Sequence, residues 1–215
     1  MEKKIQTILD DLIMRHPELG TVKNNIAEAY EIIRSSYEKG GKLLVAGNGG
    51  SAADSEHIVG ELMKGFVKKR PVPEDFRKAL MAVNETEGEK LAEHLQGALP
   101  AVSLTCHEGL STAYSNDVDG EYTFAQQLYG FGRPGDVFLA ISTSGGSRNI
   151  LAAAVVAKAM GIRVVGLSGK TGGKLKDLSD CAIVVPSSET FLIQELHLPV
   201  YHALCLMLEE TFFPV

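Results

Sequence analysis

Five short apolar runs, separated by stretches with helical periodicity, restrict the fold of this 215-residue chain more than any other feature. The runs cover residues 42–46, 101–104, 137–141, 164–167 and 181–185. Helical patterns of apolar residues fill the intervals, over 52–64, 107–116, 121–130, 147–159 and 190–212. Buried strands that alternate with helices are typical of a parallel sheet covered on both faces. The sequence therefore predicts an α/β fold, a three-layer αβα sandwich with a mostly parallel sheet.

Two segments depart from this alternation. Residues 1–40 carry two amphipathic helical patterns, over 4–15 and 22–38. Residues 71–100 are polar, have prolines at both ends and contain charged helical stretches. We expect one domain over 1–215, with N-terminal helices and an inserted helical segment.

Composition argues against several classes of protein. The net charge of −6 comes without the basic stripe of a nucleic-acid-binding surface, and the one dense basic cluster, residues 64–70, is interpreted as a solvated helix end. Three widely spaced cysteines fit neither a disulfide framework nor a zinc knuckle, and indicate a reducing compartment. The N-terminus has no signal-peptide pattern, and polar residues interrupt the most apolar segment, 192–208. We expect a cytoplasmic protein with no nucleic-acid or membrane partner.

A glycine-rich loop, residues 47–51, connects the first strand to a helix and reads Gly-Asn-Gly-Gly-Ser. Glycine allows a tight turn and lets a ligand approach the backbone. The N-terminus of the following helix favours an anion or polar oxygen atoms. A plain turn with a serine cap explains the same residues equally well. The spacing also matches a dinucleotide fingerprint, but no clear ribose-binding acid follows about 20 residues on.

A second loop, residues 142–147, again lies between a strand and a helix and reads Ser-Thr-Ser-Gly-Gly-Ser. Four hydroxyl groups in six residues exceed what a single helix cap needs. Hydroxyl groups and glycine-exposed amides at a helix N-terminus form a phosphate cradle without a lysine. The loop predicts a phosphate site.

Polar residues at helical spacing indicate acid–base chemistry. His57 and Glu61 are one turn apart on the helix that starts at the first loop, which suits a metal site, a general base with an orienting partner, or a plain surface pair. In the apolar final helix, Gln194 and His202 share one side about 12 Å apart along the axis. His197 falls off that side and is interpreted as a packing or solvent-facing residue.

Together these motifs resemble those of the SIS-domain phosphoheptose isomerases, also called sedoheptulose 7-phosphate isomerases. The resemblance runs from about residue 20 to the C-terminus, except over 71–100. The matching motifs are Asn48-Gly-Gly-Ser51, His57-x-x-x-Glu61, Asn116-Asp117, Ser142-Thr-Ser-Gly-Gly-Ser147, and Gln194-Glu-x-His197 followed by His202. Two positions depart from the family pattern, because Gly65 replaces a basic residue and Phe191 an acidic one.

The resemblance implies a set of substrate contacts and a reaction. Substrate-binding residues would be Asn48, Gly49, Gly50, Ser51, Asn116, Asp117, Ser142, Thr143, Ser144, Ser147 and Gln194, with the hydroxyl loop on the phosphate. Glu61 would be the base and His202 the acid that convert sedoheptulose 7-phosphate to D-glycero-D-manno-heptose 7-phosphate through an enediol.

The resemblance also implies a cofactor and an assembly. Zinc would be held by His57, Glu61, Gln194 and His202, although glutamine is an unusual zinc ligand. The family forms homotetramers with sites between subunits, which agrees with a final helix too apolar for solvent.

Two alternatives remain open from the sequence. A non-catalytic phosphosugar-binding regulator, or a relative of the replication initiator-associating protein, would share the fold and the hydroxyl loop but lacks the glutamate matching Glu61. An isomerase of another sugar phosphate would also share the loop, since a phosphate site does not sense the length of the sugar.

Overall fold

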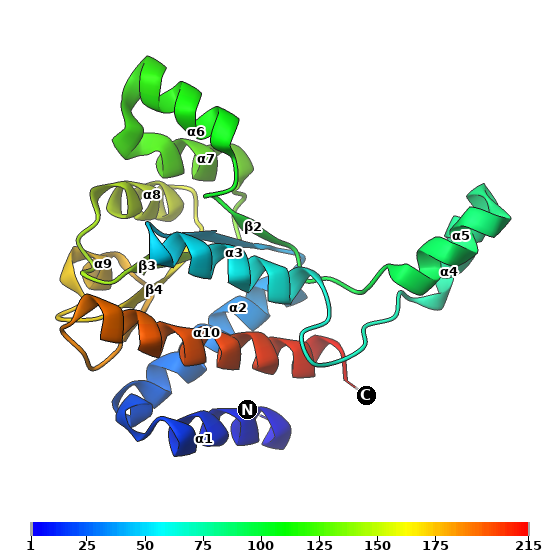
Figure 1. The fold of residues 1–215 in the computed structure, drawn as a ribbon, viewed down its shortest axis with the longest axis horizontal. Coiled ribbons are helices and arrows are strands. Elements are labelled where there is room, and N and C mark those ends of the chain that lie inside the picture. Colours follow the sequence, from blue (N-terminus) through cyan, green and yellow to red (C-terminus); the bar gives the residue numbers. More distant parts are fainter. Residues whose placement is uncertain (1, 215) are drawn as a thin grey trace.

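The computed structural model describes residues 2–214 and contains a five-stranded parallel sheet between two layers of helices (Figure 1). The strands are β1 (Leu43–Ala46), β2 (Ala101–Ser103), β3 (Val137–Ser142), β4 (Arg163–Ser168) and β5 (Cys181–Val184). Their order is β2-β1-β3-β4-β5, and every neighbouring pair is parallel. The predicted sandwich is confirmed, and each apolar run of the sequence lies within one residue of a strand at either end.

Alternating strand residues divide the core into two parts. Leu43 and Val45 of β1 face one layer, which contains α1 (Lys3–Arg15), α2 (Lys23–Glu38), α3 (Gly50–Met63) and α10 (Thr190–Phe212). Leu44 and Ala46 face the other, which contains α7 (Thr123–Phe131), α8 (Arg148–Ala159) and α9 (Gly173–Leu178). A central strand that buries both faces needs a continuous apolar sequence, which is why these strands do not alternate with polar residues.

The sheet order places both glycine-containing loops at one edge. After β1 the chain passes to β2 on one side, and later to β3 on the other, so strand order reverses between β1 and β3. Ala46 at the end of β1 pairs with Ala140 in β3, and the loops at 47–51 and 142–147 leave the sheet side by side. Open parallel sheets bind their ligands in the crevice at such a reversal.

Between β2 and α7 the helical pattern is broken into short pieces. α6 (Glu108–Tyr114) runs into a π-helical turn, η2 (Ser115–Asp119), and a 3₁₀ turn, η3 (Gly120–Tyr122). An earlier 3₁₀ segment, η1 (Pro17–Val22), joins α1 to α2. α9 was not predicted, because six residues that start with a glycine show no helical period.

The final helix, α10, is 23 residues long and contains an 18-residue window with a mean hydropathy of 1.3, which by length and composition alone is enough to cross a membrane. In the structure it packs against α1, α2 and α3, and 56% of its apolar window is buried inside the protein. Its apolar character is thus explained in large part by the core of this fold.

The inserted segment forms a helical hairpin that projects from the body (Figure 1). It consists of α4 (Glu74–Val83) and α5 (Glu85–His94), as the sequence predicted for a helical insertion. The two connecting segments meet at an antiparallel bridge between Pro71 and Gln96. We call residues 74–94 the arm.

A buried ion pair stands at the base of the arm. Arg70 and Glu209 are both almost fully buried, and Arg70 Nε donates to Glu209 Oε1 at 2.8 Å. The guanidinium also donates to the backbone carbonyls of Leu62 at 2.8 Å and Glu61 at 3.1 Å. The interpretation of 64–70 as a solvated helix end is therefore wrong for Arg70, because its charge is satisfied by a carboxylate and by the carbonyls that end α3.

Candidate functional site

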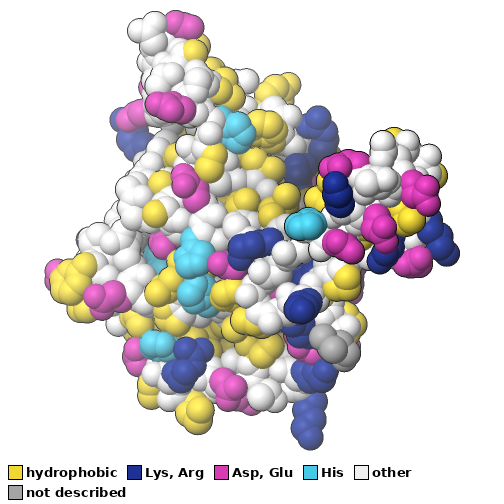
Figure 2. Space-filling view, turned by 45° about the vertical axis from the view of Figure 1, so that its right-hand side comes forward, with side chains coloured by type: hydrophobic (Ala, Val, Ile, Leu, Met, Phe, Trp, Pro, Cys, Tyr) yellow, Lys and Arg dark blue, Asp and Glu magenta, His cyan; other side chains and the backbone are white. Residues whose placement is uncertain are grey.

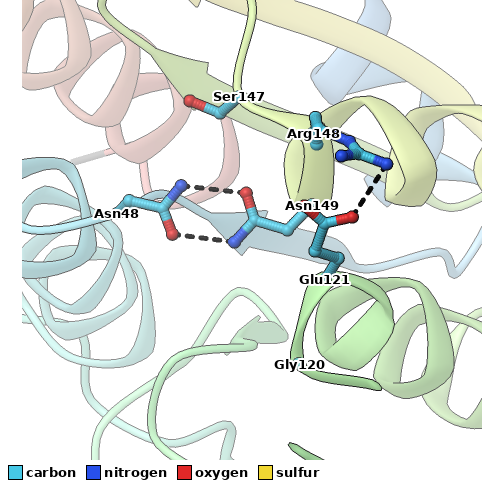
Figure 3. A pocket seen from close by; sticks show the side chains of 6 residues that line it. All are labelled: Asn48, Gly120, Glu121, Ser147, Arg148 and Asn149. Carbon is cyan, nitrogen blue, oxygen red and sulfur yellow. Dashed lines mark hydrogen bonds and ion pairs between the residues drawn. The ribbon is translucent and has the colours of Figure 1, made fainter. Parts of the chain in front are cut away.

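A reciprocal amide pair joins the two loops (Figure 3). Asn48 Nδ2 donates to Asn149 Oδ1, and Asn149 Nδ2 donates to Asn48 Oδ1, both at 2.9 Å. Asn48 lies in the first loop and Asn149 in the first turn of α8. The pair holds the N-terminal ends of α3 and α8 at a fixed separation.

The hydroxyl loop folds into a tight turn ahead of α8. Ser142 Oγ and Ser147 Oγ are 2.9 Å apart, and Ser144 Oγ accepts from the Gly146 N–H at 3.1 Å. Gly145 has φ +63°, and a Cβ atom there would overlap the backbone of Gly172. Only glycine fits at 145, because both the backbone angle and the neighbouring chain exclude a side chain.

A cavity of about 280 Å³ lies between the two loops and the start of α10. Its lining residues from the predicted site are Asn48, Gly49, Gly50, Ser51, Ser142, Thr143, Ser147 and Gln194. Thr190 and Ile141 complete it. Gln194 lies so close to Gly50 that a Cβ atom on Gly50 would overlap its amide. Ser144 is the one hydroxyl of the loop outside this lining, since its oxygen stabilises the loop's own turn.

A second hollow of about 410 Å³ shares Asn48 and Ser147 with the first and is also lined by residues 120–121 and 148–149 (Figure 3). Arg148 and Glu121 form an ion pair of 3.0 Å at its wall, which connects α8 to η3. Both side chains are largely exposed, so the pair contributes little stability.

The predicted acid–base residues meet on the facing sides of α3 and α10. His57 Nε2 lies 3.3 Å from Glu61 Oε1, and Lys64 Nζ lies 3.0 Å from Glu61 Oε2. The ring centroids of His57 and His202 are 5.0 Å apart. These residues lie farther along the same two helices whose starts line the cavity at Gly50 and Gln194.

Two residues that the sequence analysis missed hold His57 in place. Tyr201 donates its hydroxyl hydrogen to Asp54 Oδ1 at 3.2 Å, and Tyr201 Oη lies 3.1 Å from His57 Nδ1. Burial raises the pKa of Asp54, and burial together with Asp54 raises the pKa of Tyr201. Asp54 was detectable from its position one turn before His57. Tyr201 gave no signal, because a tyrosine in an apolar helix is ordinarily part of the core.

The two remaining histidines of α10 differ in environment. His202 is partly buried, and its Nε2 atom has no hydrogen-bond partner among residues 2–214. Burial, and then the nearby His57, lower the pKa of His202, so its ring is neutral at pH 7. His197 is fully buried, and burial lowers its pKa to about 4. The sequence analysis predicted that His197 either packs in the core or faces solvent, and the structure shows that it packs in the core.

The four predicted zinc ligands do not converge as they are placed. His57, Glu61 and His202 are neighbours, but Gln194 lies beside Gly50, about 12 Å from His202 along the helix axis. Within residues 2–214, no three His, Cys, Asp or Glu side chains surround a point as a metal ion requires. The side chains as arranged therefore do not fit zinc, and we derive no chemical step from it.

Asn116 and Asp117 lie apart from the cavity. Both are exposed on the π-helical turn, where Asn116 Nδ2 donates to Asp117 Oδ1 at 2.9 Å. Neither lines either hollow beside Asn48. Within a single chain, Asn116 and Asp117 therefore do not lie at the hydroxyl loop.

Comparison with known proteins gives a consistent result. Residues 14–98 and 92–169 match the SIS domain family. A phosphoheptose isomerase of Rhodospirillum rubrum is 35% identical over 98% of both chains, and that of Nitratiruptor sp. is 42% identical over 80% of this chain and 78% of its own. Among solved structures, phosphoheptose isomerase GmhA from Neisseria gonorrhoeae has a TM-score of 0.73 and 28% identity, covering 97% of this chain and 98% of its own. The phosphoheptose isomerase from Francisella tularensis has a TM-score of 0.75 and 30% identity, covering 96% and 97%.

Proposed function

Because the chain belongs to the SIS-domain phosphoheptose isomerases, we propose that it converts sedoheptulose 7-phosphate to D-glycero-D-manno-heptose 7-phosphate. One observation carries the proposal for this chain. The hydroxyl loop, Asn48 and Gln194 enclose one cavity, and the His57, Glu61 and His202 side chains lie farther along the same pair of helices. A phosphate held at the loop directs the rest of a sugar toward a carboxylate and an imidazole.

The cavity and the acid–base residues lie on the same two helices. α3 and α10 both start at the cavity and run in the same direction, since Gly50 contacts Gln194 and His57 contacts Tyr201. The His57, Glu61 and His202 side chains therefore lie farther toward the C-terminal ends of the two helices that begin at the cavity.

Glu61 has the position of the base. Lys64 Nζ donates to one oxygen of its carboxylate, and the other oxygen lies 3.3 Å from His57 Nε2. Side chains on a helix lean toward its N-terminus, so Glu61 and His57 point back toward the cavity. We assign to Glu61 the removal of the proton from the carbon beside the carbonyl.

His202 has the position of the second proton carrier. A neutral imidazole holds a proton on one nitrogen and a lone pair on the other. Such a ring can give a proton to one oxygen of an enediol and accept one from its neighbour, as the neutral histidine of other isomerases does. The unpartnered Nε2 atom supports this assignment.

Tyr201 and Asp54 orient His57. When Tyr201 donates to Asp54, its oxygen accepts from His57 Nδ1–H, so that nitrogen carries a proton. The His57 ring is thereby fixed with Nε2 toward Glu61. Tyr201 and Asp54 act through His57 and are positioning residues.

Assembly and compartment belong to the proposal as well. We propose a homotetramer with sites between subunits, supported by Asn116 and Asp117, which a neighbouring subunit could use. The three unpaired cysteines, one exposed and two buried, support a reducing cytoplasm. Zinc at His57, Glu61, Gln194 and His202 stays a prediction. About one zinc per chain in freshly purified protein, removed by a chelator, would support it, and substoichiometric metal would contradict it.

The decisive experiment follows aldose formation from sedoheptulose 7-phosphate. We expect turnover by the natural chain and a loss of at least about a hundredfold in Glu61→Gln, as for removal of a general base. Faster turnover of pentose or hexose phosphates would contradict the heptose assignment. Binding of the heptose phosphate without turnover would identify a phosphosugar-binding regulator instead.

A further inference from the structure

The arm carries an apolar stripe that stays largely exposed within the described residues 2–214. Phe76, Ala79, Leu80 and Val83 of α4 recur at the spacing of one helix face, yet no residue of α4 is buried. Val83 is 89% exposed and Phe76 is 46% exposed. Leu91 of α5 and Leu95, the residue that follows this helix, are also exposed. An apolar helix face that remains exposed in the single chain indicates a binding surface.

α4 and α5 already pack against each other, so α5 is not the partner that the exposed stripe lacks. Gly88 of α5 lies directly against the backbone of Leu80, where a Cβ atom would overlap it. Two helices of ten residues each, on extended connections, are marginal on their own. Arg77, Ala92 and Glu93 at the base of the arm share a hollow of about 650 Å³ with residues 65–71, while α4 and α5 project away from the body (Figure 1). A surface that covers the exposed stripe therefore has to come from another molecule.

The charge of the arm restricts that surface. Residues 74–94 contain six acidic side chains and three basic ones, a net charge of −3, and Figure 2 shows acidic side chains gathered over the projecting arm. A matching surface has to be apolar and basic.

One such surface lies on this chain, at the root of the arm. In residues 63–69, Met63 is 45% exposed and Val67 is 70% exposed, and Lys64 and Lys69 are exposed beside them. This segment follows α3 and leads into Arg70, whose buried pair with Glu209 fixes it to the body. Glu209 also accepts from the backbone N–H groups of Phe66 and Val67, so the surface is rigid.

We propose that the arm of one chain docks onto residues 63–69 of a second copy of the same chain. The apolar stripe around Phe76 and Val83 covers Met63 and Val67 of the other copy, and the acidic residues of the arm face its lysines. The docking surface, residues 63–69, lies shortly before the arm in the sequence. A two-fold axis between two copies therefore lets each copy dock its arm onto the other. Lys64 also contacts Glu61, so the test reads the mass of the protein and not its turnover, and a failed contact leaves the proposed function standing.

The test measures the mass of the full-length chain by light scattering and sedimentation across micromolar concentrations. We expect an oligomer, and we expect Phe76→Glu with Val83→Glu to raise the concentration for half-dissociation by at least about tenfold. Val67→Glu, on the opposite side of the contact, has the same effect. Lys78→Glu is the matched control, since it places the same new charge on the opposite face of α4, and it leaves the mass unchanged.

A second variant removes the arm without disturbing the body. The bridge between Pro71 and Gln96 allows residues 73–94 to be replaced by a short glycine turn. We expect this chain to keep its circular dichroism spectrum and lose the arm-dependent mass. A monomeric natural chain, or unchanged mass in either glutamate variant, would overturn the proposal.

Discussion

The guanidinium of Arg70 and the carboxylate of Glu209 meet inside the protein, 139 positions apart in sequence and 2.8 Å apart in space. Burial alone would raise the pKa of Glu209, but N–H donors from Val67, Phe66 and Arg70 outweigh it and lower that pKa below its usual value. Arg70 in turn binds the last carbonyls of α3, including that of Glu61. The pair thus joins the helix of the proposed base to the end of α10.

Removing one member of this pair is expected to destabilise the protein strongly. Arg70→Leu leaves the Glu209 charge buried and uncompensated, and we expect a loss of about 3–5 kcal/mol in the free energy of unfolding by urea. Arg70→Leu combined with Glu209→Leu recovers part of the loss. A single variant that loses less than about 1 kcal/mol would contradict the structural role.

Gly145→Ala tests the hydroxyl loop. The new Cβ atom meets the backbone of Gly172 at a positive φ angle, so the loop has to change shape, at a cost of order 1–3 kcal/mol. We expect KM for the sugar phosphate to rise by roughly ten- to a hundredfold, measured by steady-state kinetics. Gly146→Ala is the control, since its Cβ atom meets only Ser144 Oγ at an ordinary 3.5 Å.

Tyr201→Phe removes the hydroxyl between Asp54 and His57. We expect kcat to fall about tenfold with little change in KM, because the ring of His57 loses its orientation while the phosphate contacts stay. Tyr30→Phe is the control, since the Tyr30 hydroxyl pairs with Thr211 away from the site. Equal kinetics in the two variants would rule out a positioning role for Tyr201.

Stability is expected to fall as the pH drops from 6.5 to 4. Burial lowers the pKa of His197 to about 4 in the folded chain, from 6.5 when exposed. Within this window the unfolded chain binds a proton that the folded chain does not, so stability rises with pH and the difference reaches about 3 kcal/mol. His197→Leu removes this contribution. Urea unfolding of both chains at pH 7 and pH 4.5 measures it, and parallel losses in both would exclude His197 as the cause.

The central strands β1 and β3 were predictable because they are buried on both faces and therefore almost entirely apolar, as over residues 137–141. The two loops were predictable because glycines and hydroxyls follow strands directly. Burial of Arg70 was not, since it depends on a carboxylate 139 residues away. The positions of Asn116 and Asp117 were not either, because their role came from the resemblance alone and the helical pattern gave no sign of the π-helical turn that carries them.

The arm leaves and re-enters the body at two paired residues, Pro71 and Gln96, outside the sheet and outside the cavity. A segment attached in this way can be lengthened, shortened or lost in one genetic event without shifting any strand. Selection can then act on how copies associate while the residues that handle the sugar stay the same. The evolutionary histories of assembly and of chemistry can therefore separate in this protein.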